Sequence, residues 1–200
     1  MNNDIKDHYK KLLTEHGDSH LSAQYSSVRS QEARFAQLLR CGDIEGKKIL
    51  DFGCGTATLA GFIKKSGIKC DYTGYDFVEE FYPIAQEKYP DARFIKENQI
   101  EKETFDFNFI SGVFNNLHSN NQKFYQETVA ALFKSASQCV AFNMMSAYVD
   151  YRDEGLFYIY PEQVFTYCKK NITPFVTIVN DYQLTEGVIP FEFACFLYKK

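Results

Sequence analysis

The stretch that most constrains the fold is Lys48–Leu59, in which two glycines stand one residue apart directly after a short apolar run. Gly53 and Gly55 lack a Cβ atom, so they permit a sharp turn and let a ligand come close to the backbone. The residues that follow, up to Ser66, have a helical pattern. A strand, a glycine turn and a helix in this order indicate an α/β fold. A tight turn that binds no ligand is the alternative interpretation.

An acidic residue lies where a nucleotide site of this kind needs one. The segment Asp71–Asp76 is predicted as a second strand, and the Asp76 carboxylate at its end can accept hydrogen bonds from ribose hydroxyls. Thr58 stands where NAD-binding proteins have their third glycine, which disfavours a diphosphate at the helix N-terminus. Asp51, two residues before the first glycine, suits a cationic amine. Together these features favour an adenosyl group that carries an amino acid.

The segment Ile49–Leu59, with Asp76 closing the next strand, resembles the class I S-adenosylmethionine-dependent methyltransferases. The resemblance implies S-adenosyl-L-methionine as cofactor. It implies an α/β fold with a doubly wound, seven-stranded, mostly parallel sheet of order 3-2-1-4-5-7-6, whose last-placed strand is antiparallel. It also implies a single domain over residues 1–200, with a helical cap over 1–45 and a Rossmann-like core over 46–200.

The resemblance assigns roles to the residues around the glycine turn. Gly53 and Gly55, with Cys54 between them, would cradle the methionine part of the donor. Asp51 would orient the donor's amine, directly or through water. Phe77 would flank the adenine ring, next to the ribose-binding carboxylate.

Two helices are predicted before the first strand, over residues 4–16 and 30–40, from the spacing of their apolar residues. This leader, with Tyr25, Gln31 and Arg34, is similar to that of one subgroup of small bacterial class I methyltransferases. The similarity implies a lid over the donor, with Tyr25 at the donor site and Arg34 reaching the donor's carboxylate. A guanidinium suits a carboxylate, and residues three apart share a helix face. The alternative is that Arg34 is a solvated surface residue.

A helix is predicted over residues 83–89, a third strand over 92–96, and a loop over 97–99. Ligands of open α/β sheets bind outside the carboxyl ends of the strands, where Asn98 and Gln99 would lie. In the family an acidic residue commonly meets the adenine amino group here, and the amide oxygen of Asn98 can accept the same bond. An ordinary loop amide is the alternative for Asn98.

A fourth strand is predicted over residues 105–114, and Ser111–Asn115 matches the subgroup's segment beside the sulfonium. Ser111 is therefore a candidate donor-site residue. His118 follows closely and is the candidate general base, because an imidazole titrates near neutral pH. A loop histidine without a catalytic role is the alternative.

The last part of the chain is predicted to complete the sheet. Two strands near the C-terminus have no room for a helix between them, so they should pair antiparallel. The aromatic-rich stretch 145–160 breaks the regular pattern, and it either shapes an acceptor pocket or packs as a cover on the core. The predicted elements are a helix over 122–137, a strand over 139–143, a helix over 161–170 and strands over 175–179 and 191–198.

Composition narrows the classes of partner. A net charge of −4 and a pI near 5.6 disfavour nucleic acid as a partner. The first 20 residues are mostly charged and polar, so we expect a cytoplasmic protein without a membrane segment. Six cysteines are scattered without C-x-x-C pairs or histidines at zinc spacing, so we expect reduced thiols and no metal site.

The expected reaction is an in-line displacement that moves the donor's methyl group to a hydroxyl or amine of a small molecule. The protein then has mainly to hold the two reactants together and exclude water. One alternative is a non-catalytic protein of the same fold that binds adenosyl ligands or partners. A nicotinamide-dependent oxidoreductase is the other, which the missing third glycine disfavours. The acceptor atom, the pathway and the oligomeric state are left open by the sequence.

Overall fold

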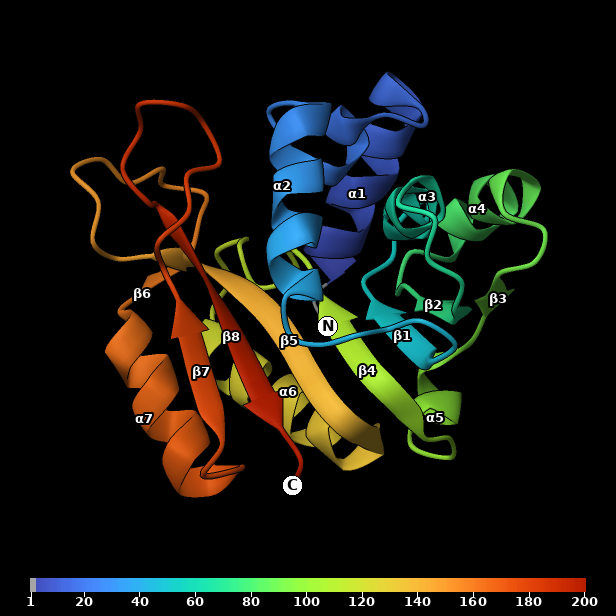
Figure 1. Cartoon of the computed structure of the whole chain (residues 1–200). Helices are drawn as coiled ribbons and strands as arrows, with labels where there is room; N and C mark the ends of the chain where they lie inside the picture. The colour runs from blue at the N-terminus through green and yellow to red at the C-terminus, as the bar shows by residue number, and fades with distance from the viewer. Residues whose placement is uncertain (1–2) are drawn as a thin grey trace.

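A computed structural model describes residues 3–200, which form a mixed sheet with helices on both faces (Figure 1). The strand order is β3-β2-β1-β4-β5-β8-β7, and the short β6 pairs with the end of β5. Neighbouring strands are parallel except for the two pairs that β8 makes. The strands are β1 Lys48–Phe52, β2 Asp71–Tyr75, β3 Arg93–Phe94, β4 Phe105–Ile110, β5 Ala136–Ser146, β6 Tyr158–Ile159, β7 Val176–Val179 and β8 Glu192–Tyr198.

The predicted topology is confirmed. The path through the sheet has the expected order once the additional strand β6 is counted, so the predicted strands 7 and 6 are β8 and β7. Among the strands that the structure describes, only β8 runs antiparallel, between β5 and β7. The predicted strand count was one too low because β6 has two residues and lies in the irregular aromatic stretch, where no periodicity can be read.

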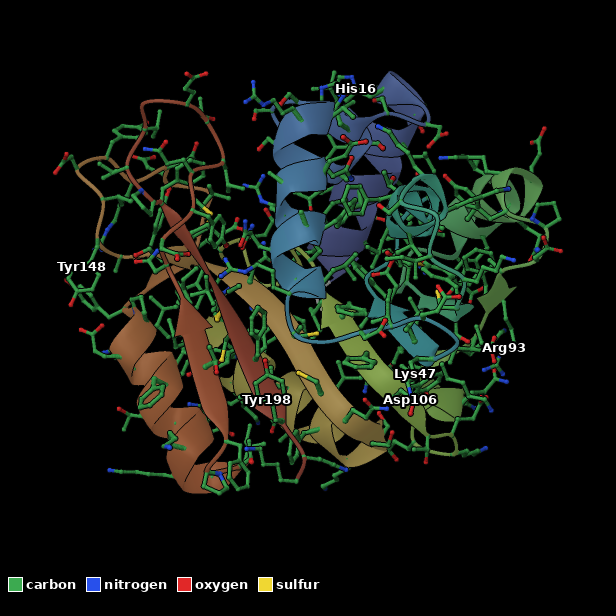
Figure 2. The ribbon with its side chains drawn as sticks, viewed as in Figure 1. His16, Lys47, Arg93, Asp106, Tyr148 and Tyr198 are labelled. Atoms are coloured by element: carbon green, nitrogen blue, oxygen red, sulfur yellow. The ribbon has the colours of Figure 1, made fainter. Side chains whose placement is uncertain are left out.

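Helices cover both faces of the sheet (Figure 1), and side chains lie between the helices and the sheet (Figure 2). Along β5, Val140 and Phe142 point to the core under α6 and α7, whereas Cys139 and Ala141 point to the core under α2 and α3. Because both faces are buried, the central strands read as nearly continuous apolar runs. The helices are α1 Asn3–His16, α2 Val28–Leu39, α3 Thr58–Lys65, α4 Tyr82–Lys88, α5 Glu97–Ile100, α6 Asn121–Ser135 and α7 Pro161–Asn171, with 3-10 turns η1 His20–Ala23 and η2 Glu79–Phe81.

The helices α1 and α2 precede the core, as predicted for the cap. The start of α2 is fixed by Ser27, whose hydroxyl accepts a hydrogen bond from the Ser30 N–H at 3.1 Å. From there α2 packs against α3, β5 and β8. The first two residues of the predicted 1–45 cap lie outside the described residues.

Several predicted boundaries were wrong, and the third strand covers only Arg93–Phe94 of the predicted 92–96. The loop over 97–99 is the short helix α5, closed at its start by a bond from the Lys96 N–H to Gln99 Oε1 at 2.8 Å. The strand β4 ends at Ile110, because Gly112 turns the chain with φ +74°. The fifth strand is longer than 139–143, since β5 pairs with β8 as far as Met145. Long-range pairing extends a strand beyond what local pattern indicates.

Candidate functional site

The glycine turn after β1 is held open toward one end of the sheet. Gly53 and Gly55 have φ of +83° and +52°, which residues with a Cβ rarely adopt. The N–H groups of Gly53 and Cys54 both donate to the Tyr75 carbonyl, at 2.7 and 3.0 Å, so the turn is tied to the end of β2. A Cβ on Gly53 would overlap Val113, whereas a Cβ on Gly55 would point into open space. The turn therefore leaves room beside Gly55 for a ligand.

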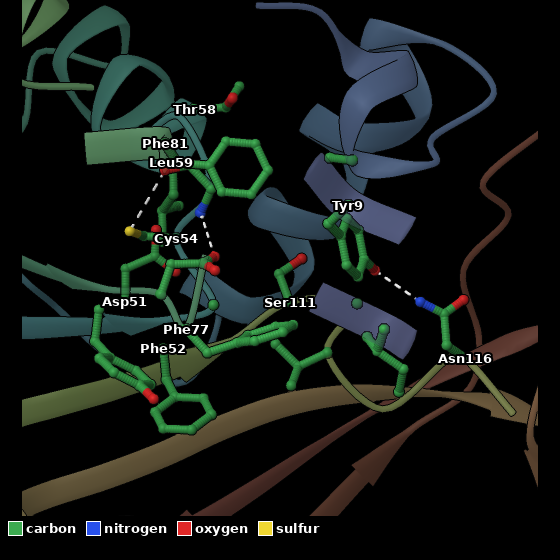
Figure 3. A pocket seen from close by; sticks show the side chains of 18 of the residues that line it. Tyr9, Asp51, Phe52, Cys54, Thr58, Leu59, Phe77, Phe81, Ser111 and Asn116 are labelled. Carbon is green, nitrogen blue, oxygen red and sulfur yellow. Dashed lines mark hydrogen bonds between the residues drawn. The ribbon is translucent and has the colours of Figure 1, made fainter. Parts of the chain in front are cut away.

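That space is part of a cavity of about 420 Å³, within the range of small-molecule sites (Figure 3). It lies at the carboxyl ends of β1, β2 and β4 and under α1 and α2. The structure brings together here nine of the residues predicted from the sequence, namely Tyr25, Asp51, Gly53, Cys54, Gly55, Asp76, Phe77, Ser111 and His118.

The Asp76 carboxylate is fixed by backbone donors at the end of β2. Its Oδ2 accepts from the Gly55 N–H and its Oδ1 from the Val78 N–H, each at 2.9 Å. Burial raises the pKa of Asp76 to about 6, although these backbone bonds oppose the rise. Each oxygen keeps a further lone pair, so the carboxylate can still accept from a ligand hydroxyl.

The Asp51 side chain lies at the end of β1 and is 3% exposed. Tyr72 donates its hydroxyl to Oδ2 at 2.6 Å. Burial raises the pKa of Asp51 to about 7, against the lowering effect of the Tyr72 bond, and the nearby Asp76 charge raises it further. A buried carboxylate next to a second carboxylate is a site that a cationic ligand group would stabilise.

Helix α1 contributes residues that the sequence did not single out. Tyr9 lines the cavity, and its hydroxyl accepts from Asn116 Nδ2 at 2.7 Å (Figure 3). The Tyr9 ring also packs edge-on against Phe77, with centroids 6.2 Å apart. Asn116 donates to Gln24 Oε1 as well, at 3.0 Å. These contacts hold α1 over the cavity. The sequence indicated only that Tyr9 lies on the apolar face of a helix.

The structure does not bring Arg34 to the cavity. Its side chain is 7% exposed, so the surface alternative is wrong, but its Nε donates to Glu192 Oε2 at 2.9 Å. Its Nη1 donates to the carbonyl and the hydroxyl of Ser30, at 3.1 and 2.6 Å. Tyr25 lies over the guanidinium, 5.0 Å from Cζ to the ring centroid, and faces the cavity. The Glu192 partner is 158 positions away, which no local pattern reveals.

The two residues predicted at the adenine, Asn98 and Gln99, have different surroundings. Asn98 lines a second hollow that adjoins the cavity and shares Asp76 and Phe77 with it. Gln99 caps the start of α5 through its side-chain oxygen, as described above. Asn98 therefore borders a hollow beside the cavity, whereas the Gln99 amide oxygen accepts a backbone bond at the start of α5.

His118 lies at the far end of the cavity, where the lining passes to the start of α6. Its ring packs edge-on against Phe124, with centroids 5.2 Å apart, and its Nδ1 accepts from the Asn120 N–H at 3.4 Å. Burial lowers the pKa of His118 below its usual 6.5. The ring is therefore neutral near pH 7, as a base must be, and Nδ1 is the nitrogen without a proton in this contact.

Within residues 3–200, no group of three or more His, Cys, Asp or Glu side chains is arranged to hold a metal ion. Over the same residues, no helix combines the length and the apolar character needed to cross a membrane.

Comparison with known proteins identifies the fold and the family signature. A family model described as a methyltransferase domain matches residues 49–135. A curated relative from Mycobacterium tuberculosis, Rv1506c, which carries a methyltransferase name, is 30% identical over 151 residues, 70% of this chain and 90% of the relative.

Solved structures of low sequence identity share the architecture. Magnesium protoporphyrin IX methyltransferase from Synechocystis PCC 6803, crystallised with SAH, matches with a TM-score of 0.69 at 12% identity, over 100% of this chain and 96% of that one. A SAM-dependent methyltransferase from Archaeoglobus fulgidus matches with a TM-score of 0.66 at 15% identity, over 90% of this chain and 98% of that one. At these identities the matches speak for the fold alone.

Proposed function

Because the chain belongs to the class I S-adenosylmethionine-dependent methyltransferases, we propose that it methylates a hydroxyl or amine of a small molecule. The observation that carries the proposal is the single cavity into which the glycine turn, Asp51 and Asp76 all open. Membership of the family excludes the nicotinamide-dependent alternative. The methyl donor of the family is S-adenosylmethionine, which supplies a methyl group made electrophilic by its sulfonium.

The residues of the cavity fit this donor. The space beside Gly55 would hold the methionine part, and the buried Asp51 would take its ammonium group. Asp76, fixed by the glycine turn itself, would accept from the ribose hydroxyls. Phe77 and Asn98, which border the adjoining hollow, would contact adenine. A cation beside these two buried carboxylates would favour their charged forms, against the burial that raises their pKa values.

The enclosure of the site supports a small acceptor. Helix α1 covers part of the cavity through Tyr9, which leaves less room beside the glycine turn for a folded macromolecule than for a small molecule. The net charge of −4 also disfavours nucleic acid as the acceptor. Transfer under such a cover needs positioning and the exclusion of water more than acid–base chemistry.

On the acceptor side, His118 is the proposed general base for a hydroxyl acceptor. Its pKa is lowered, which keeps the ring neutral, and it lines the far end of the same cavity. To accept a proton on Nδ1, the ring must give up the long contact with the Asn120 N–H. An amine acceptor would need the base less, because a neutral amine already has a free lone pair.

The test is calorimetric binding of S-adenosylmethionine and S-adenosylhomocysteine, with NADH as control ligand. We expect both adenosyl ligands to bind the wild type and Asp76→Ala to lose most of the affinity. Asp91→Ala, at an exposed aspartate beyond α4, is the matched control and should bind as the wild type does. Binding of NADH instead, or of neither adenosyl ligand, would overturn the donor site.

The acceptor class has a separate test. Purified protein is incubated with methyl-labelled donor and a cell extract that has been divided by size into small molecules and macromolecules. Label in the small-molecule fraction supports the proposal, and label only in the macromolecular fraction contradicts it. Inactivity of a His118→Gln variant that still binds S-adenosylhomocysteine would support the proposed base.

A further inference from the structure

A buried polar network lies behind the wall of the cavity, centred on Glu192 at the start of β8. Glu192 is 0% exposed and carries three hydrogen bonds. Oε2 accepts from Arg34 Nε at 2.9 Å, and Oε1 accepts from Asn143 Nδ2 on β5. The Tyr182 hydroxyl also donates to Oε1, at 3.5 Å. The carboxylate therefore joins the cap helix α2 to two strands of the sheet.

One branch of the network reaches the cavity through Asn143. The Asn143 side chain is 1% exposed, and its Oδ1 accepts from the Gly112 N–H at 2.9 Å. Gly112 has φ +74° and lines the cavity just after β4. Because Glu192 bonds Asn143 Nδ2, it fixes which end of the amide points at Gly112. The carboxylate thus sets the geometry of a cavity residue that it does not touch.

The second branch runs through Arg34 to Tyr25. The guanidinium lies under the Tyr25 ring, and the Tyr25 hydroxyl pairs with Ser111 Oγ at 3.2 Å. A Cβ on Gly112 would lie 2.7 Å from the Tyr25 hydroxyl oxygen, so the glycine makes room for this ring. Both branches therefore converge on Ser111 and Gly112, which together form one stretch of the cavity wall.

Stability alone is a weak reason for this arrangement. Taking an arginine and a glutamate out of water carries a desolvation cost that apolar side chains of similar size do not have. What apolar side chains cannot do is orient the Asn143 amide. We infer that Glu192 is a positioning residue, which holds Gly112 through Asn143 and so shapes the wall of the donor site. The inference rests on the proposed function, since it takes the cavity to bind the adenosyl donor.

The test compares two double variants that differ in one side chain. Arg34→Met/Glu192→Leu removes the ion pair and also the acceptor for Asn143. Arg34→Met/Glu192→Gln removes the ion pair but keeps an amide oxygen that can accept from Asn143 Nδ2. We expect the glutamine double to unfold at a temperature close to that of the wild type, because it leaves no buried charge unpaired. The leucine double should unfold at a somewhat lower temperature, because the buried Asn143 amide loses its acceptor.

The two doubles should separate in binding of S-adenosylhomocysteine, measured by calorimetry. We expect the leucine double to bind about tenfold more weakly than the glutamine double, on the scale of one lost hydrogen bond. Glu186→Gln, at an exposed glutamate before β8, is the control and should bind as the wild type does.

A second readout needs no ligand. The chain has 11 glycines, so selective ¹⁵N-glycine labelling gives a sparse amide spectrum in which Gly112 can be followed. Its amide proton should move upfield in the leucine double and in Asn143→Ala, and stay near the wild-type position in the glutamine double.

The outcomes are separable. Equal affinity of the two folded doubles, or a Gly112 amide that does not move in the leucine double, would overturn the positioning role. If the leucine double fails to fold, Asn143→Ala decides, because it cuts the same branch and leaves the Arg34–Glu192 pair; unchanged affinity there overturns the inference. A wild type that does not bind S-adenosylhomocysteine would overturn the proposed function, while the glycine spectrum would still report on the network.

Discussion

The buried Asp51 carboxyl should make the free energy of unfolding depend on pH. Its pKa rises from 3.8 to about 7 in the folded protein, chiefly because burial penalises the charged form. A folded-state pKa above the unfolded value means that the contribution to stability is full below about pH 4 and is lost as the pH rises through 7. Replacing the group by a neutral amide, Asp51→Asn, removes that loss. The amide oxygen can still accept from the Tyr72 hydroxyl.

The size of the effect follows from the shift. The pKa of Asp51 rises by about three units, and each unit corresponds to about 1.36 kcal/mol. At pH 8 the wild type should therefore be about 4 kcal/mol less stable than a protein with a neutral side chain at this position. At pH 5 the corresponding difference is about 1.5 kcal/mol, since only the unfolded chain is then charged. We therefore expect Asp51→Asn to stabilise the protein at pH 8 and to lose most of that advantage by pH 5. Asp76 titrates in both proteins, so its contribution largely cancels.

The assay is urea unfolding followed by far-ultraviolet circular dichroism at the two pH values, with Asp91→Asn as the exposed control. The same variant should bind S-adenosylhomocysteine more weakly, because the neutral amide cannot pair with the ligand's ammonium. Wild-type affinity should rise with pH between 5.5 and 8, as binding then no longer has to displace a proton from Asp51. A variant less stable than the wild type at pH 8, or a stability difference that does not shrink by pH 5, would refute the reasoning.

Three further substitutions test other parts of the site. Tyr9→Phe removes the hydrogen bond to Asn116. It should speed the release of S-adenosylhomocysteine several-fold in stopped-flow displacement, while the free energy of unfolding changes by about 1 kcal/mol. An unchanged release rate would show that α1 does not gate the cavity. Gly53→Ala would bring a Cβ against Val113 at a position with positive φ. It should lower the free energy of unfolding by more than about 1 kcal/mol beyond the loss in Gly46→Ala, whose φ is +67° and whose surroundings are open. Equal losses in the two variants would contradict the packing. For a hydroxyl acceptor and saturating donor, the acid limb of the wild-type turnover should lie below pH 6.5. His118→Gln should abolish that limb together with most of the activity.

The part of the site that could be predicted from the sequence is the part built from short segments. Gly53, Gly55 and Asp76 lie at fixed distances from strand ends, and a parallel sheet necessarily brings those ends to one edge. The order of the strands followed from the resemblance and from the lack of a helix between β7 and β8. Such features need only the local period and the connection lengths.

In the cap, the partner of a buried side chain could not be predicted from local spacing. Helical spacing correctly places Gln31 and Arg34 on the buried side of α2, but spacing does not say what the other wall offers. Here the wall offers a glutamate from the last strand, and a guanidinium forms its strongest bonds with the nearest carboxylate. The arginine was therefore expected at the donor's carboxylate and is found paired with Glu192 instead. Because Arg34 is already paired with Glu192, we expect the Gln31 amide, which lines the cavity, to meet the donor's carboxylate in its place. The affinity for the donor should then depend less on ionic strength than it would with an arginine free to pair with that carboxylate.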